Sequence, residues 1–144
     1  MTPAQRDAIL REATSWLGTP FRHAARIKGV GVDCGQLLIA VYSEAGVLAD
    51  FTPEDYQPDW FLHRSRERYL EELTKRADPV EHPYEVGDVL TYRYGRAVSH
   101  AGIYVGDGWL IHANGRAGEV TRSQVSMRGL SDHFAGAYRL RTDA

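Results

Sequence analysis

The sequence holds a single cysteine, Cys34, among 144 residues. One cysteine excludes a disulfide within the chain and excludes zinc motifs that need several thiolates. Two interpretations of Cys34 stay open, a buried packing residue or a nucleophile. An arbitrary lone cysteine is more often the first, so its position in the fold must decide between them.

Long apolar runs and an excess of one charge sign are also missing. No stretch approaches the roughly 20 apolar residues that cross a bilayer, so we expect no membrane insertion. The opening MTPAQRDAILREA lacks the apolar core of a signal peptide, and we therefore expect synthesis in the cytoplasm. A net charge of −2 with scattered basic residues disfavours nucleic-acid binding.

No repeat, low-complexity tract or linker divides the chain. Its length and 43% hydrophobic content predict one domain over residues 1–144. From residue 85 the hydrophobic pattern alternates and predicts five strands: residues 87–94, 97–105, 109–114, 119–125 and 134–140. Because helical patterns precede these strands, the predicted class is α+β, with N-terminal helices packed on an antiparallel sheet of about five strands.

Three helices are predicted before the strands. The first begins at Thr2, where Gln5 at N3 favours a capping box, and it ends at Gly18. The second begins at Asp33, a residue type that caps helices well. The third covers residues 60–77, whose apolar side chains share one side of a helix.

The second helix gives Cys34 a reactive position. With Asp33 as its cap, Gln36 occupies N3 and Gly46 suits the position after its end. Cys34 then lies in the first turn, where the helix dipole and free backbone N–H groups favour a thiolate. The glycine-rich segment before it lets a substrate come close. We therefore favour a nucleophile and expect its sulfur to be open to solvent.

Two histidines stand in the predicted hairpin SHAGIYVGDGWLIHA, where apolar residues are usual. A two-residue loop would place His100 and His112 on opposite faces of the ribbon. A three-residue loop over residues 106–108 places His112 opposite Gly102, diagonal to His100 and on its face. Gly108 suits the left-handed conformation that such a loop needs, so we predict this loop and a meeting of the two imidazoles.

A cysteine and two histidines supply the parts of a thiol hydrolase. The thiol needs an imidazole as base, and that imidazole needs a partner to fix its tautomer. Cys34, His100 and His112 fill these roles in principle.

Four segments together resemble the NlpC-type cell-wall cysteine peptidases, whose catalytic core is papain-like. They are GVDCGQLLIAVYSEAG, EVGDVLTYRY, SHAGIYVGDGWLIHA and FAGAYRL, and the likeness extends from about residue 9 to residue 140. The segment LGTPFRHAARIKGVGVDC resembles the small phage and gene-transfer-agent branch of the family.

The resemblance implies hydrolysis of peptidoglycan stem peptides beside γ-D-glutamyl and meso-diaminopimelyl residues, without a cofactor. Cys34 matches the nucleophile, His100 the general base and His112 the residue that orients the base. The resemblance further implies a virion-associated component with phage tail proteins as partners, which acts in the periplasm or cell wall.

Two departures from the family pattern concern the site. Many members have tyrosine at the position of Phe21, and phenylalanine donates no hydrogen bond to an oxyanion. The family often has Asp-Cys-Ser-Gly where this chain has Asp-Cys-Gly-Gln at residues 33–36.

Weaker candidates surround these three residues. His23 and Arg26 precede the nucleophile and could bind a stem-peptide carboxylate, as arginine forms paired hydrogen bonds with such groups. Tyr104 and Trp109 are more simply core residues. The remaining histidines are interpreted as surface residues without partners: His63, His82 and His133.

Three alternatives to a peptidase stay open. The first is a non-catalytic structural or binding module of a phage tail tip, which the three intact site residues oppose. The second is an amidase or acyltransferase that uses the same thiol. The third is a metal site built from Cys34, His100 and His112, which we rank last.

Overall fold

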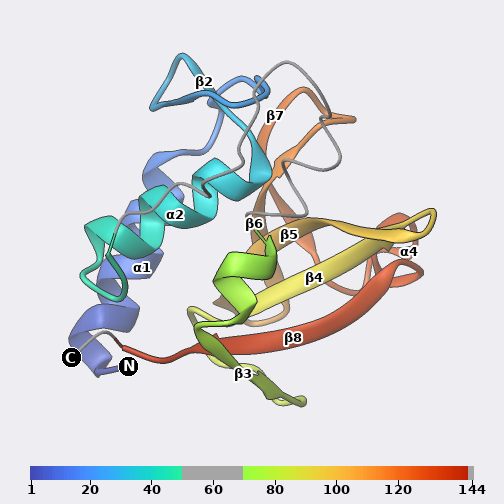
Figure 1. The fold of residues 1–144 in the computed structure, drawn as a ribbon. Coiled ribbons are helices and arrows are strands. Elements are labelled where there is room, and N and C mark those ends of the chain that lie inside the picture. The colour runs from blue at the N-terminus through green and yellow to red at the C-terminus, as the bar shows by residue number, and fades with distance from the viewer. Residues whose placement is uncertain (50–69, 143–144) are drawn as a thin grey trace.

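Helices pack on a six-stranded antiparallel sheet in this computed structural model, which describes residues 1–49 and 70–142 (Figure 1). The helices include α1 (Pro3–Ser15), α2 (Cys34–Glu44) and the short α4 (Arg128–Ser131). The sheet has the spatial order β3 (Ala77–Val80), β8 (Phe134–Leu140), β4 (Val89–Tyr94), β5 (Ala97–Gly106), β6 (Trp109–Asn114) and β7 (Glu119–Gln124). A separate ribbon pairs β1 (Arg26–Ile27) with β2 (Gly31–Val32). The predicted α+β class is confirmed.

The predicted starts of the first two helices are confirmed. Thr2 accepts a hydrogen bond from the backbone of Gln5 at 3.1 Å, and the Gln5 side chain accepts one from the backbone of Thr2 at 2.9 Å. Asp33 caps α2 by accepting from the backbone of Gln36 at 2.9 Å. These side chains satisfy N–H groups that have no partner within the helix.

The two faces of the sheet carry separate cores. On one face α2 contacts β5 and β6, and α1 packs against α2. Their shared core includes Ile9, Trp16, Leu37, Val41, Tyr42, Ile103 and Ile111. The other face holds a smaller cluster around Leu90, Tyr92, Leu110 and Leu130, to which α4 contributes. The site described below lies where strands of this sheet meet the start of α2.

The third predicted helix is confirmed in part. Residues 60–69 lie outside the described ranges, and residues 70–74 are helical. The predicted end at residue 77 is wrong, because Ala77 begins β3, which pairs antiparallel with β8. This strand is the sixth where about five were expected. It tolerates Pro79 because an edge strand needs hydrogen bonds on one side only.

The turn between β5 and β6 differs from the predicted three-residue loop. Gly106 pairs with Trp109, so the loop itself is Asp107 and Gly108, with φ of 53° and 81°. The additional residue lies in β5 instead, where the register shifts between Tyr104 and Gly106. A bulge of this kind changes the register as an extra loop residue would.

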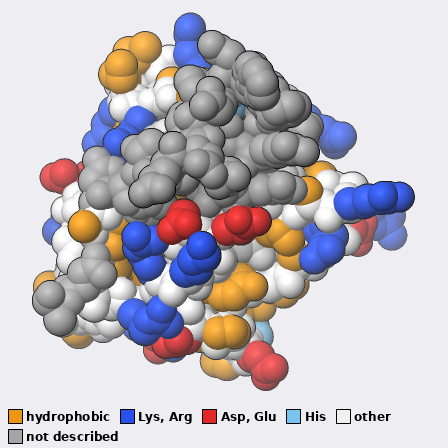
Figure 2. Space-filling model, in the orientation of Figure 1, with side chains coloured by type: hydrophobic (Ala, Val, Ile, Leu, Met, Phe, Trp, Pro, Cys, Tyr) orange, Lys and Arg blue, Asp and Glu red, His pale blue; other side chains and the backbone are white. Residues whose placement is uncertain are grey.

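Acidic and basic side chains are mixed on the face shown in Figure 2. Ion pairs at the surface include Arg141 with Asp78 at 2.7 Å and Lys75 with Glu72 at 3.1 Å. Within residues 1–49 and 70–142, no helix is long and apolar enough to span a bilayer.

Candidate active site

Cys34 is the first residue of α2, and Asp33 fixes the backbone around it. One carboxylate oxygen of Asp33 caps the helix, while the other accepts the backbone N–H of Ala24 at 2.7 Å. Ala24 has φ of 62°, a left-handed conformation that is uncommon outside glycine. A single buried side chain therefore holds both the start of α2 and the loop before it.

The sulfur of Cys34 is oriented toward β5. Its Sγ donates to the carbonyl oxygen of Ser99 over 3.6 Å, and Ser99 directly precedes His100. The exposed fraction of Cys34 is 0%, so the expectation of an open sulfur is wrong for this conformation. A substrate can reach this atom only after neighbouring groups move.

A β-bulge explains how Ser99 reaches the thiol. Tyr92 pairs with His100 and Arg93 pairs with Val98, so Ser99 is an extra residue in β5. The extra residue of a bulge leaves the regular ladder and bends its strand. Here the bulge brings the backbone of β5 against the start of α2.

The two predicted histidines meet. Nε2 of His100 lies 2.7 Å from Nδ1 of His112, and the ring centroids are 5.0 Å apart. The pairing of Ile103 with Ile111 sets His112 opposite Gly102, as expected from the sequence. Sequence reasoning thus gave the correct register at the histidines, although the turn that produces it is different.

Gly102 permits this close approach. A Cβ atom at that position would lie 2.9 Å from the Cβ of His112 and 2.7 Å from Cγ of Leu110. Contacts this short do not occur between real side chains, so β6 would have to shift. The absence of a side chain at residue 102 keeps His112 against β5.

His112 is buried and neutral at ordinary pH. Only 3% of its surface is exposed, and this burial lowers its pKa from 6.5 to about 4. Its Nε2 lies 2.9 Å from Oγ of Ser123 and 3.4 Å from Oγ1 of Thr121, both on β7. A neutral imidazole has one donor and one acceptor nitrogen, so His112 can orient His100 without carrying a charge.

A hollow of about 370 Å³ opens beside the two histidines. Its other lining residues include Tyr94, Arg116 and His133. The ring of His133 stacks on Tyr94 with centroids 4.3 Å apart, and its Nδ1 lies 2.9 Å from the carbonyl oxygen of Arg93. The interpretation of His133 as a surface residue without partners is therefore wrong.

The chain matches the NlpC/P60 family over residues 18–139. It belongs to this family. A probable endopeptidase of Mycobacterium tuberculosis is 31% identical over 109 residues, which are 76% of this chain and 23% of that protein. The gamma-DL-glutamyl hydrolase of Bacillus subtilis is 30% identical over 125 residues, covering 86% of this chain and 27% of the hydrolase. The chain thus spans about a quarter of the length of these relatives.

Solved structures share the fold. A Staphylococcus aureus protein of the NLP/P60 family has a TM-score of 0.73 at 20% identity, over 99% of this chain and 43% of its own. RipD from Mycobacterium tuberculosis, described as a non-catalytic NlpC/p60 domain protein, has a TM-score of 0.64 at 20% identity. That match covers 97% of this chain and 98% of RipD. At these identities the likeness shows the fold alone.

The two residues predicted to bind substrate lie apart in this NlpC/P60 domain. Nδ1 of His23 is 3.7 Å from Oδ2 of Asp33, which places His23 beside the start of α2. Both of its ring nitrogens are buried, and neither has a hydrogen-bond partner among the described residues. Arg26 instead lines a hollow with Glu12 and Trp16, and that hollow includes neither His100 nor His112.

Aromatic residues of the NlpC/P60 domain take different positions around the site. The Phe21 ring lies close to Gly115, which lines the hollow of the histidines. A Cβ atom added at Gly115 would be 3.8 Å from that ring. Tyr104 packs against the smaller core, as expected from the sequence. Trp109 is half-buried and lies under the guanidinium of Arg122 at 4.4 Å.

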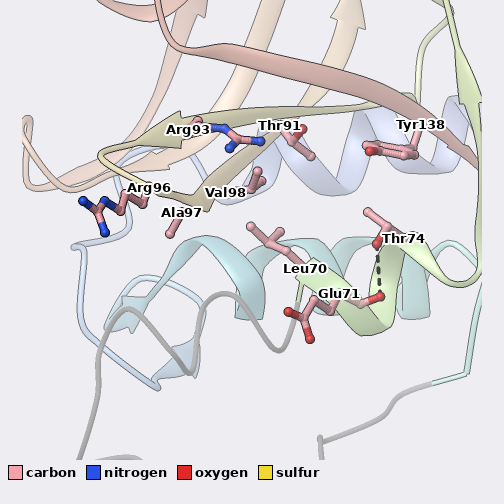
Figure 3. Close-up of a pocket in the computed structure, with 9 residues that line it drawn as sticks. All are labelled: Leu70, Glu71, Thr74, Thr91, Arg93, Arg96, Ala97, Val98 and Tyr138. Atoms are coloured by element: carbon pink, nitrogen blue, oxygen red, sulfur yellow. Dashed lines mark hydrogen bonds between the residues drawn. The ribbon is translucent and has the colours of Figure 1, made fainter.

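A second hollow of about 330 Å³ lies away from the histidines (Figure 3). It lies between residues 70–74 and the β4–β5 hairpin, and Arg93, Arg96 and Glu71 are among its lining residues. It includes none of the three predicted catalytic residues, so we do not place the site there.

The remaining sequence expectations have mixed outcomes. His82 is exposed, as predicted, but its ring meets that of Tyr84 edge-on with centroids 5.5 Å apart, so the expectation of no partner is wrong. His63 lies outside the described ranges. Among the residues that the structure describes, no three His, Cys, Asp or Glu side chains are grouped as metal ligands would be. The sequence did not identify Ser123 as a site residue. The available signal was that Thr121 and Ser123 place polar side chains on one face of a strand.

Proposed function

We propose that this chain is a cysteine peptidase that cleaves peptidoglycan stem peptides. One observation supports it most directly. Cys34 donates to the backbone carbonyl of Ser99, and the next residue, His100, is hydrogen-bonded to His112. Family membership adds support, because a curated relative in this family is named as an endopeptidase.

The proposed reaction passes through a thioester. Cys34 gives its proton to His100, and the thiolate attacks the carbonyl carbon of the scissile amide. His100, now an imidazolium, protonates the leaving amine as the C–N bond breaks. Water then attacks the thioester, His100 takes its proton, and the carboxylic product leaves as the sulfur is protonated again. The backbone N–H of Cys34 at the start of α2 is the proposed oxyanion donor.

We propose the bond between γ-D-glutamyl and meso-diaminopimelyl residues as the substrate. Support comes from the name of the Bacillus subtilis relative, a gamma-DL-glutamyl hydrolase. His23 and Arg26 stay proposed ligands of a stem-peptide carboxylate. Because they lie in different surroundings, substituting each to alanine should separate their contributions to KM.

Digestion of purified sacculi tests the proposal. We expect the wild-type protein to release fragments, whereas Cys34→Ala releases none at equal concentration. Mass analysis of the fragments identifies the bond, and release of whole stem peptides with a free N-terminal amine, leaving a muramyl carboxylate, would point to the amidase alternative instead. Equal inactivity of both proteins would contradict a peptidase.

The buried sulfur favours a second candidate, a domain that binds peptidoglycan without cleaving it. Cys34 has an exposed fraction of 0%. A non-catalytic member of this fold exists in RipD. Sedimentation with sacculi distinguishes the two: binding by both proteins without fragment release supports the second candidate.

Association with a phage tail and action in the periplasm or cell wall are also proposals. They rest on the likeness of residues 17–34 to the phage and gene-transfer-agent branch of the family. Detection of this chain in purified particles by mass spectrometry would support them, and its absence from such particles would contradict them.

A further inference from the structure

Ser123 contacts the nitrogen of His112 that faces away from His100. On β7, Ser123 pairs with Leu110 and Thr121 pairs with His112, so both hydroxyls share the face of the imidazole. Oγ of Ser123 is 2.9 Å from Nε2, within ordinary hydrogen-bonding distance. Ser123 is itself buried, which removes water as a ready substitute.

The contact between the two imidazoles fixes how protons are distributed. At 2.7 Å, one of the facing nitrogens must donate and the other must accept. If neutral His112 holds its proton on Nδ1, then Nε2 of His100 accepts, and neutral His100 keeps its own proton on Nδ1. No nitrogen of His100 is then left to take a proton from a thiol.

The opposite tautomer leaves the base competent. When the proton of His112 is on Nε2, its Nδ1 accepts from Nε2 of His100. Nδ1 of His100 is then free of a proton and can receive one. A hydrogen-bond acceptor at Nε2 of His112 stabilises this arrangement.

We propose that Ser123 is a positioning residue that accepts the Nε2 proton of His112 and thereby keeps His100 in its basic form. The effect of Ser123 on rate rests on the proposed cysteine chemistry, whereas its effect on the tautomer does not.

Other groups near the pair do not replace Ser123. Oγ1 of Thr121 is 3.4 Å from Nε2, longer than a good hydrogen bond, and it is also contacted by Asn114 at 3.4 Å. Tyr92 and Tyr94 contact the ring of His100 rather than His112. Arg116 and His133 line the hollow and complete the set of described charged or titratable groups facing it.

Nitrogen NMR of the ¹⁵N-histidine-labelled protein without substrate tests the tautomer directly. We expect wild-type His112 to carry its proton on Nε2 at pH 7. Ser123→Ala should shift His112 toward the Nδ1 tautomer, whereas Ser123→Thr keeps an acceptor and should restore the wild-type signal. Thr121→Val, nearly isosteric on the same strand, should leave the signal unchanged.

Sacculus digestion supplies the second readout. Ser123→Ala should lower kcat about 10-fold with KM unchanged, the factor that one neutral hydrogen bond is worth. Proton on Nδ1 in the wild type, or an unchanged tautomer and kcat in Ser123→Ala, would overturn the inference. If the wild type cleaves no sacculi, the proposed function fails, while the NMR result still decides the role of Ser123.

Discussion

At the scale of single residues, the histidine pair depends on a position without a side chain. Gly102 faces His112 across the β5–β6 ladder, and a methyl group there would overlap both His112 and Leu110. The imidazole of His112 has no room to retreat, because its other nitrogen is held by Ser123 at 2.9 Å. Geometry at the pair is therefore sensitive to one methyl group on the neighbouring strand.

Substituting Gly102 by alanine should weaken both the fold and the site. We expect the free energy of unfolding to fall by about 1–3 kcal/mol, the usual cost of overpacking. Sacculus hydrolysis should fall at least about 10-fold because His112 moves from His100, a loss equal to one hydrogen bond. Urea unfolding and the digestion assay measure the two effects.

Ala137→Gly is the matched control, since it removes a buried methyl group from β8, a strand that carries neither histidine. It should lower stability by about 1 kcal/mol and leave hydrolysis per folded molecule unchanged. Full activity in Gly102→Ala would show that the histidine distance is not limiting.

The scale of helices and strands shows what sequence can and cannot predict here. Alternation gives β6 and β8 with their observed ends, and caps give the starts of α1 and α2. The bulge at Ser99 was not predictable, because an inserted residue depends on what another element brings against the strand. β3 was also missed. Its Pro79 argues against a strand, and the position of β3 at the sheet edge beside β8, which makes the proline tolerable, is set by tertiary packing.

The candidate site divides in the same way. The register of β5 against β6 requires only local pairing, so the approach of His100 and His112 follows from sequence. The burial of Cys34 and the contact of Ser123 depend on how separate elements pack together, which local patterns do not contain. Serine is also common on strands, so Ser123 gave no distinct signal beyond its polar position on an inward face.

Asp33 links the start of α2 to the loop before it, so removing its side chain should change the accessibility of the Cys34 sulfur. Asp33→Ala removes the cap and leaves the part-buried N–H of Ala24 without its acceptor. We expect the free energy of unfolding to fall by about 2–3 kcal/mol. Fraying of the first turn should also expose the sulfur, so iodoacetamide should alkylate Cys34 faster than in the wild type.

Thr2→Ala is the control for this change, because Thr2 caps α1 in the same manner. It should cost about 1 kcal/mol and leave the alkylation rate of Cys34 at the wild-type value. Equal acceleration in both variants would mean that alkylation follows global unfolding and not the local cap.

At the scale of the whole molecule, buried polar groups join the helices to the sheet. Asp88 is fully buried in the turn before β4 and forms two hydrogen bonds with Arg139 of β8, at 2.8 and 2.9 Å. Tyr42 of α2 donates to the carbonyl oxygen of Gly87 in the same turn, at 2.8 Å. His112 is a further buried polar group, within the sheet, and its own burial lowers its pKa.

Folding stability should therefore depend on the protonation of His112. Its pKa is about 4 in the folded protein and about 6.5 when exposed. Above pH 6.5 both states are neutral, but between pH 6.5 and 4 the unfolded chain binds a proton that the folded one does not. The free energy of unfolding contributed by His112 should thus fall by about 3 kcal/mol as the pH is lowered through this window.

Urea unfolding at pH 7 and pH 4.5 of the wild type and His112→Asn measures this contribution. Carboxylates titrate in both proteins, so their effect cancels in the difference. We expect the wild type to lose about 2–3 kcal/mol more than the variant over this interval, because asparagine does not titrate. An equal fall in the free energy of unfolding of the two proteins would mean that folded His112 binds its proton as readily as an exposed histidine. His112 would then become charged in the mildly acidic range and could no longer be the neutral acceptor that His100 requires.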